Sequence, residues 1–221
     1  YSFLKSVLPI SYPHENGGLP LEIPNLKYDT LKSYHQTYYQ PSNSCFMTYG
    51  SIPVATHLKF LNNVLMSSQK VSVDSSVLDE NHWTLPRRVT AFGYPDPLIS
   101  DKKRQITLTV GYKMKSYDTY DMFVMSIIAS LLIDGPNCPF YASLIEPHIG
   151  LDYSPILGYI EETKHRIFAI GLAGIGESDI ENVENIIQRT FEKVVNEGFD
   201  KQHVNDLIDT LELKFKHHTP S

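Results

Sequence analysis

The chain has 221 residues, of which 42% are hydrophobic and 20% are charged, a balance typical of a globular protein. Its net charge is −6 and its basic residues are scattered, which excludes the basic stripe that neutralises nucleic-acid phosphates. The most apolar run, Met122 to Ile133, is too short for a bilayer span of about 20 residues. We therefore expect neither nucleic acid nor a membrane as a partner.

The first part of the chain predicts a helix, a strand and a second helix after an irregular, Pro- and Gly-rich connection. The predicted elements are a helix that Asp29 or Thr30 caps and Pro41 stops, a strand from Ser44 to Gly50, and a helix with Leu58, Leu61, Asn62 and Leu65 on one face. This order is typical of the end of an α/β unit. Residues 69–86 show no periodic spacing of apolar residues and are rich in Ser, Asp and Asn, which predicts a linker.

The second part of the chain predicts four strands and several helices. The predicted strands are Arg88 to Tyr94, Gln105 to Met114, Tyr153 to Glu162 and Arg166 to Gly174, and the last two are joined by a short connection that favours an antiparallel hairpin. The predicted helices are one capped by Asp118 that ends at Ile133, a short one after Pro139, one with a Ser178–Glu181 capping box that Gly198 ends, and one capped by Asp200 with Leu207, Ile208, Leu211 and Phe215 facing inward.

Together these elements predict an α+β fold, with helices packed on one face of a mostly antiparallel sheet. The two cysteines, Cys45 and Cys138, do not make a disulfide framework, so a reducing compartment is favoured.

The residues alone assemble no active site. A zinc peptidase commonly places two histidines one helical turn apart with a glutamate between them, and no pair of the nine histidines has that arrangement. His217 and His218 are adjacent and would point about 100° apart on a helix. The sequence contains no nucleophile elbow, phosphate-binding glycine loop or cysteine-based zinc cluster. We therefore assign no catalytic, cofactor-binding or metal-ligating residue.

Five phrases, in order along the chain, resemble the M16 (pitrilysin/insulinase) metallopeptidases, in particular the subgroup that contains presequence protease and falcilysin. The phrases are Gly17-Gly18-Leu19-Pro20 with Ile23-Pro24-Asn25-Leu26; Tyr34-His35 through Tyr38-Tyr39-Gln40-Pro41-Ser42-Asn43 with Tyr49-Gly50; Leu131-Leu132 with Pro139-Phe140-Tyr141-Ala142-Ser143-Leu144-Ile145-Glu146; Phe168-Ala169-Ile170-Gly171-Leu172-Ala173-Gly174-Ile175; and Glu197-Gly198-Phe199-Asp200 before a helix that contains Glu212. Each phrase alone is an ordinary turn, cap or strand.

The resemblance implies four α+β domains that close around a chamber, and a domain assignment for this chain. Residues 1–68 resemble the C-terminal part of the first, catalytic-type domain, residues 69–86 a linker, and residues 87–221 most of the second domain. The zinc-binding His-x-x-Glu-His motif and its distal glutamate would lie upstream of Tyr1. Zn²⁺ is thus expected in the longer protein and not on this chain's own residues, which are expected to be inactive alone.

The resemblance also implies a peptide-binding exosite, since a strand edge in the second domain of relatives pairs with the backbone of the substrate. The matching residues are Ile133, Asp134 and Gly135, with Ser154, Ile156 and Gly158 on the strand from Ser154 to Tyr159. The alternative is that this strand lies inside the sheet.

Two functions remain open on this basis. The first is a segment of a zinc endopeptidase that degrades unstructured peptides, with peptide substrates and the remaining M16 domains as its partners, in a mitochondrion, plastid or vacuole-type compartment. The second is a segment of a non-catalytic M16 relative, such as a processing-peptidase partner or a respiratory-complex core subunit. A third, an independent protein-binding domain, is disfavoured by the resemblance.

Overall fold

The computed structural model describes residues 2–14, 17–81, 83–114 and 118–217. The chain divides into two compact units. The sheet unit consists of Tyr1–Pro13 and Asp79–Ser221, and the helical unit consists of His14–Leu78. Residues 1–13 thus belong to the same unit as the C-terminal part of the chain. The family-domain assignment, with bounds 1–68, 69–86 and 87–221, stays a prediction. No helix in the described ranges is both long enough and apolar enough to cross a membrane.

The helical unit contains both predicted helices. Its elements are the 3₁₀ turns η1 (Ile23–Asn25) and η2 (Pro41–Asn43) and the helices α2 (Tyr28–Tyr38) and α3 (Val54–Leu65). Helix α2 begins at Tyr28 and has no side-chain cap, so the prediction of a cap at Asp29 or Thr30 was wrong. It ends three residues before Pro41, as predicted.

The predicted strand from Ser44 to Gly50 is not formed. These residues are exposed, and they pair with no strand in the described ranges. A strand needs a neighbour for its backbone N–H and C=O groups, so a short run of strand-forming residues alone does not create one. None of the described residues in the helical unit is buried.

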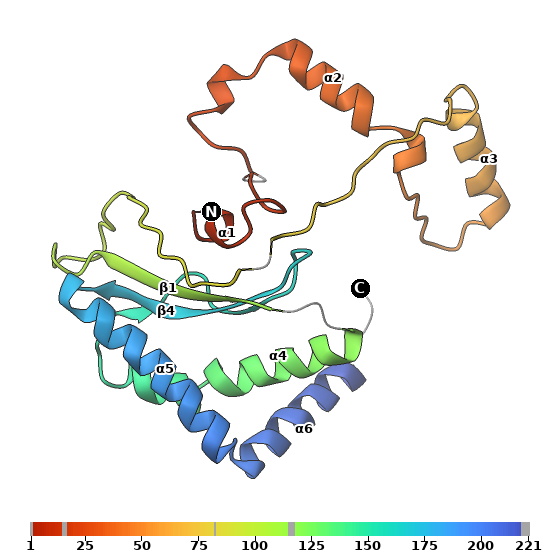
Figure 1. Ribbon diagram of the computed structural model, residues 1–221. Helices are drawn as coiled ribbons and strands as arrows, with labels where there is room; N and C mark the ends of the chain where they lie inside the picture. Colours follow the sequence, from red (N-terminus) through yellow and green to blue (C-terminus); the bar gives the residue numbers. More distant parts are fainter. Residues whose placement is uncertain (1, 15–16, 82, 115–117, 218–221) are drawn as a thin grey trace. The chain divides into compact units, whose positions relative to one another are not determined.

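The sheet unit is built around one central strand (Figure 1). Its strands are β1 (Ile106–Lys113), β2 (Asp152–Tyr153), β3 (Gly158–Ile160) and β4 (Ile167–Ile175). Strand β4 pairs antiparallel with β1 on one side and with β2 and β3 on the other. The predicted antiparallel hairpin and the α+β class are confirmed.

Two strand predictions in the sheet unit were also wrong, one wholly and one in part. Residues 88–94 form no strand, and Phe92 and Tyr94 are almost fully exposed. The strand predicted from Tyr153 to Glu162 is split into β2 and β3 by a turn. Ser154 stabilises this turn, because its hydroxyl donates a hydrogen bond to the carbonyl of Ile156 at 2.7 Å.

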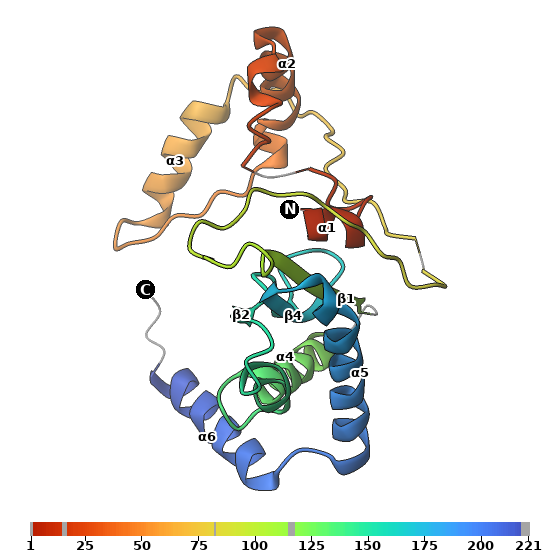
Figure 2. The same cartoon turned by 90° about the vertical axis from the view of Figure 1, so that its left-hand side faces the viewer.

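Helices cover both faces of the sheet (Figures 1 and 2). The elements of the sheet unit are α1 (Ser2–Val7), α4 (Thr119–Ile133), the π-helical turn η3 (Tyr141–Ile145), the 3₁₀ turn η4 (Glu177–Asp179), α5 (Ile180–Glu197) and α6 (Lys201–His217). Helices α4 and α5 pack on one face, and the short helix α1 lies on the other. The prediction of helices on one face therefore holds for the long helices, with α1 added opposite them.

Most predicted helix ends are confirmed. Asp118 accepts a hydrogen bond from the backbone N–H of Asp121 at 2.9 Å, and Asp200 accepts one from His203 at 3.0 Å. Gly198 ends α5 with a φ of 75°, a conformation that glycine adopts without strain. The capping box predicted at Ser178 and Glu181 is not formed.

A 3₁₀ turn precedes α5 instead. In this turn, the Asp179 carboxylate accepts the backbone N–H of Gly176 at 2.9 Å.

The core lies between β4 and the helices α4 and α5. Alternate residues of β4, namely Phe168, Ile170 and Leu172, are buried there. On the opposite face, Ile167 packs against Val7 and Leu8, and Gly111 of β1 leaves room for α1, because an added Cβ there would lie 2.6 Å from the Phe3 ring. Helix α6 contributes less than predicted, because the side chain of Phe215 is 68% exposed and that of Ile208 is 46% exposed.

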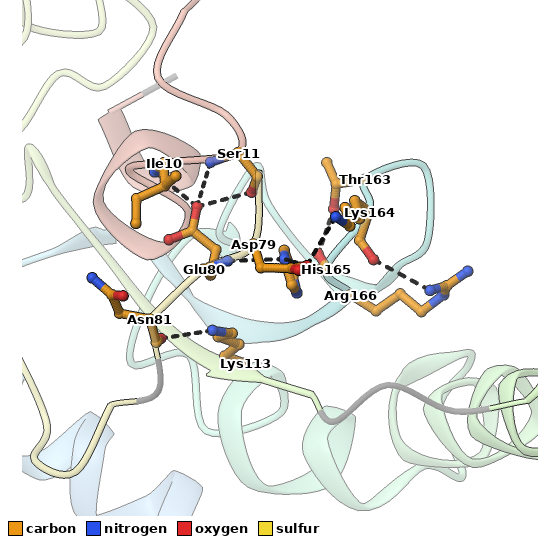
Figure 3. Close-up of polar contacts among 10 residues, drawn as sticks. All are labelled: Ile10, Ser11, Asp79, Glu80, Asn81, Lys113, Thr163, Lys164, His165 and Arg166. Carbon is orange, nitrogen blue, oxygen red and sulfur yellow. Dashed lines mark hydrogen bonds and ion pairs between the residues drawn. The ribbon is translucent and has the colours of Figure 1, made fainter. Parts of the chain in front are cut away.

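A buried carboxylate fastens the two segments of the sheet unit that flank residues 14–78 (Figure 3). One oxygen of Glu80 accepts hydrogen bonds from the backbone N–H groups of Ile10 at 2.8 Å and Ser11 at 2.5 Å, and from the Ser11 hydroxyl at 2.8 Å. Burial would raise the pKa of Glu80, but the bonds from Ser11 and Ile10 lower it below the usual glutamate range. The carboxylate is therefore charged at neutral pH. We call this group of bonds the Glu80 clamp.

The close approach of β1 and β4 gives a test of the sheet. A Cβ added at Gly171 would lie 1.9 Å from the carbonyl oxygen of Leu108, a backbone atom that cannot move without breaking the ladder. We expect Gly171→Ala to destabilise the sheet unit by about 3 kcal/mol or more, which lowers its melting midpoint by roughly 5–10 °C. Thermal unfolding followed by circular dichroism measures this.

Gly93→Ala is the matched control, since nothing lies within 4 Å of its added Cβ. Its midpoint should stay within about 2 °C of the parent chain, as for most exposed substitutions. Equal melting of both variants would contradict the pairing of β1 with β4.

Candidate functional site

A hollow of about 280 Å³ lies beside strand β3, between it and helix α4. Its lining residues come from one face of α4, from the residue that follows α4, and from β3 with its flanks: Ser126, Ala129, Ser130, Ile133, Asp134, Leu157, Gly158, Tyr159 and Glu161. The hollow therefore combines apolar carbon with hydroxyl and carboxylate groups.

Strand β3 lies at an edge of the sheet. It pairs with β4, and no other strand of the described ranges pairs with it. At Gly158 the backbone has a φ of 84°, and the nearest atom to an added Cβ is Cδ1 of Ile133 at 3.9 Å. The missing side chain leaves the backbone of Gly158 open beside the hollow, at a position where only glycine is unstrained.

Three of the six predicted exosite residues meet at this hollow. Ile133, Asp134 and Gly158 all line it, although α4 and β3 are separated by more than twenty residues in sequence. Asp134 follows the last turn of α4, and its backbone N–H donates to the carbonyl of Ser130 at 2.8 Å. Its side chain is exposed.

The other three predicted residues do not line the hollow. Gly135 is exposed in the next turn with a φ of 109°. Ser154 is buried, and its backbone N–H bonds to the carbonyl of Gly171 at 2.9 Å, so it extends the pairing of β2 with β4. Ile156 lies in the turn between β2 and β3, half-buried. Ser154 is thus buried beside β4 and does not line the hollow.

The turn after α4 is held in place by Cys138. Its backbone N–H donates to the carbonyl of Gly135 at 3.2 Å, and its thiol contacts the carbonyl of Ser130 at 3.5 Å. The thiol also lies 3.8 Å from Nε2 of His203 in α6. Burial, with a smaller contribution from Asp134, raises the pKa of Cys138 to about 11. Since a thiol with this pKa is almost wholly protonated at neutral pH, Cys138 acts here as a packing residue and not as a nucleophile.

Sequence reasoning missed the polar face of α4. Ser126 and Ser130 are four residues apart on one face of the mostly apolar α4, and Asp134 continues this spacing just after the helix ends. Helical spacing alone could have identified this face. Glu161, which lines the hollow from the other side, carried no such signal, because it lies just after β3.

A zinc site does not fit the described residues. No three histidine, cysteine, aspartate or glutamate side chains in ranges 2–14, 17–81, 83–114 and 118–217 come together in a group that could hold a metal ion. Cys138 and His203 form only a pair, and the high pKa of the thiol disfavours the thiolate that metals bind.

Curated relatives match nearly the whole chain. The chain is 37% identical over 213 residues to the mitochondrial presequence proteases of Xenopus tropicalis and of Mus musculus, and 33% identical over 225 residues to that of Drosophila melanogaster. These alignments cover 96–100% of the chain but only 21–22% of each relative. The chain thus spans about a fifth of the length of these relatives.

The fold has a solved counterpart. A protease from Helicobacter pylori superposes with a TM-score of 0.58 at 13% identity, covering 90% of this chain and 47% of the other. At that identity the likeness concerns the fold alone. A family model described as the peptidase M16 inactive domain matches residues 25–211, far more than half of the sequence. On this match, and on the antiparallel sheet with its long helices α4 and α5, the chain belongs to the peptidase M16 family.

Proposed function

We propose that this chain is a segment of a zinc metalloendopeptidase that degrades unstructured peptides in a closed chamber. In this proposal it supplies part of the chamber wall and a peptide-binding exosite, and it does not supply the zinc centre. The names of the relatives, mitochondrial presequence proteases, support a peptidase and a mitochondrial compartment. Both remain proposals here, because the chain spans only about a fifth of those proteins.

The observation that carries the exosite is the open edge of β3 beside the hollow. An extended peptide can add to such an edge as a further strand, because the outer side of an edge strand is not engaged by a neighbouring strand. Gly158 leaves room for the peptide backbone to approach, since an added Cβ there has no atom closer than 3.9 Å. The hollow lined by Ile133 and Asp134 can then hold a side chain of the peptide. Backbone pairing of this kind tolerates many sequences, which suits a degradative enzyme.

The domain assignment is part of the same proposal. Residues 1–68 would complete a catalytic-type domain whose other elements come from elsewhere in the polypeptide, residues 69–86 would be a linker, and residues 87–221 would form most of a second domain. Two observations support this assignment. No described residue of the helical unit is buried, and α2 and α3 expose the large apolar side chains of Leu31, Tyr34, Leu58 and Phe60. Such surface is normally covered in a folded protein.

The zinc of the proposed enzyme would be bound by other parts of the polypeptide, since the described residues offer no ligand group. We therefore derive no catalytic step from this chain. The remaining domains of the same polypeptide are its proposed partners, together with peptide substrates.

A non-catalytic M16 protein is the second candidate. The matching family model is itself described as an inactive domain, which suits a segment that serves binding or assembly. The two candidates differ in the rest of the polypeptide: an intact His-x-x-Glu-His motif with a distal glutamate selects the enzyme, and altered ligands select the non-catalytic relative.

The first prediction concerns the chain alone. We expect the purified 221-residue chain to show no chelator-sensitive hydrolysis of a quenched fluorescent peptide, because its described residues hold no metal-binding group. The full-length protein, assayed alongside, should cleave the same peptide and lose this activity with a chelator. Zinc-dependent cleavage by the isolated chain would refute the placement of the metal centre elsewhere.

The second prediction concerns the exosite in the full-length protein. Gly158→Trp should weaken the binding of an extended peptide by about tenfold or more, because the indole would cover the open edge of β3. Fluorescence anisotropy with a labelled peptide measures the dissociation constant, and metal analysis checks that the zinc content is unchanged.

Gly158→Ala is the matched control. It imposes the same backbone strain at a φ of 84° but adds one methyl group that meets nothing closer than 3.9 Å. Its affinity should stay within about threefold of the parent, since only the edge is left uncovered. If Trp and Ala variants bind the peptide alike, the exosite is elsewhere.

A further inference from the structure

His165 occupies a junction between two segments that are distant in sequence (Figure 3). It belongs to the turn that joins β3 to β4, and its Nε2 atom lies 3.1 Å from the backbone nitrogen of Glu80. The same Nε2 atom lies 3.5 Å from Oδ1 of Asp79. One ring nitrogen thus faces a donor and a carboxylate at once.

The two contacts require opposite protonation states. The backbone N–H of Glu80 can only donate, so it needs an Nε2 that carries no proton. The Asp79 carboxylate can only accept, so it binds Nε2 well only when that nitrogen is protonated. A neutral imidazole with its proton on Nδ1 satisfies the first contact, and an imidazolium satisfies the second.

Charged groups of both signs surround the ring. Asp79 is paired with Lys164 at 2.9 Å, and Lys113 of β1 donates to the carbonyl of Asn81 at 2.9 Å. The Asp79 pKa is lowered, chiefly by the hydrogen bond and charge of Lys164 and to a lesser degree by His165 and Lys113. Arg166 follows in the chain, and its guanidinium contacts the carbonyl of Lys164 at 3.4 Å.

The carboxylate of Glu80 points to Ile10 and Ser11 and away from the ring (Figure 3). It is engaged by the backbone of Ile10 and Ser11, and its pKa lies below the ordinary range because of these bonds. It therefore keeps its charge while a histidine titrates. The two interactions of Glu80 are therefore independent. Its side chain forms the Glu80 clamp, and its backbone N–H contacts His165.

We propose that His165 is a proton-operated latch on the segment 79–81. In the neutral state it accepts the Glu80 N–H and fixes this segment to the β3–β4 turn. On protonation it releases that N–H and pairs with the Asp79 carboxylate, which loosens the backbone of Glu80 while the Glu80 clamp persists. The latch adjusts how firmly the chain is anchored where it re-enters the sheet unit after residues 14–78. It does not depend on the proposed peptidase function.

Amide exchange in the 221-residue chain, measured residue by residue by NMR, tests the latch. We expect the protection factor of the Glu80 amide to fall by about tenfold or more across the pH interval in which the His165 ring nitrogens are seen to gain a proton in the same NMR series. The Ile10 and Ser11 amides should keep their protection, because the Glu80 carboxylate stays charged. The imidazole nitrogen shifts should identify Nε2 as unprotonated at the higher pH.

Two variants make the outcome specific. His165→Gln keeps a side-chain acceptor but cannot titrate, so the pH dependence of the Glu80 amide should disappear. Asp79→Asn removes the carboxylate that favours the imidazolium, so the release should move to lower pH. The proposal is overturned if Nε2 carries the proton at the higher pH, if Glu80 protection is independent of pH, or if either variant behaves like the parent chain.

Discussion

Strand β4 is the element on which the rest of the sheet unit depends, because the other three strands pair with β4 and not with one another. Its alternate residues Phe168, Ile170 and Leu172 form the core with α4 and α5, while Gly171 lets β1 approach closely. The turn before β4 also places His165, and the strand before that turn is β3. The hollow and the latch are therefore both fixed by one buried strand.

The sequence predicted an element well when the residues that determine it are close together in the chain. Helices were found because their determinants are local: Asp118 and Asp200 cap their own helices, and Gly198 ends α5. Strands were found where both partners lie within the chain, as for β1 and β4. The segments 44–50 and 88–94 also contain strand-forming residues, but they have no partner in the described ranges, and the local sequence carries no information about a missing neighbour.

The candidate site was predictable only in part, for a related reason. The family resemblance identified Ile133, Asp134 and Gly158 as candidate exosite residues, and all three line one hollow. It did not reveal the turn that Ser154 makes with Ile156, in which Ser154 is buried and does not line the hollow. That turn depends on a side-chain hydrogen bond and on pairing with β4, and neither is visible as a period in the sequence.

The two proposals meet in the β3–β4 hairpin and are linked thermodynamically if both hold. A peptide would add to β3 at its open edge, and a neutral His165 would hold the segment 79–81 to the turn at the end of the same hairpin by accepting the Glu80 N–H. If protonation of His165 shifts the β3–β4 turn, it and peptide binding would change each other's equilibrium by the same factor, because coupling between two binding sites is reciprocal. Such coupling needs no movement of distant parts. It follows because a short turn joins both contacts to the strand that holds the sheet together.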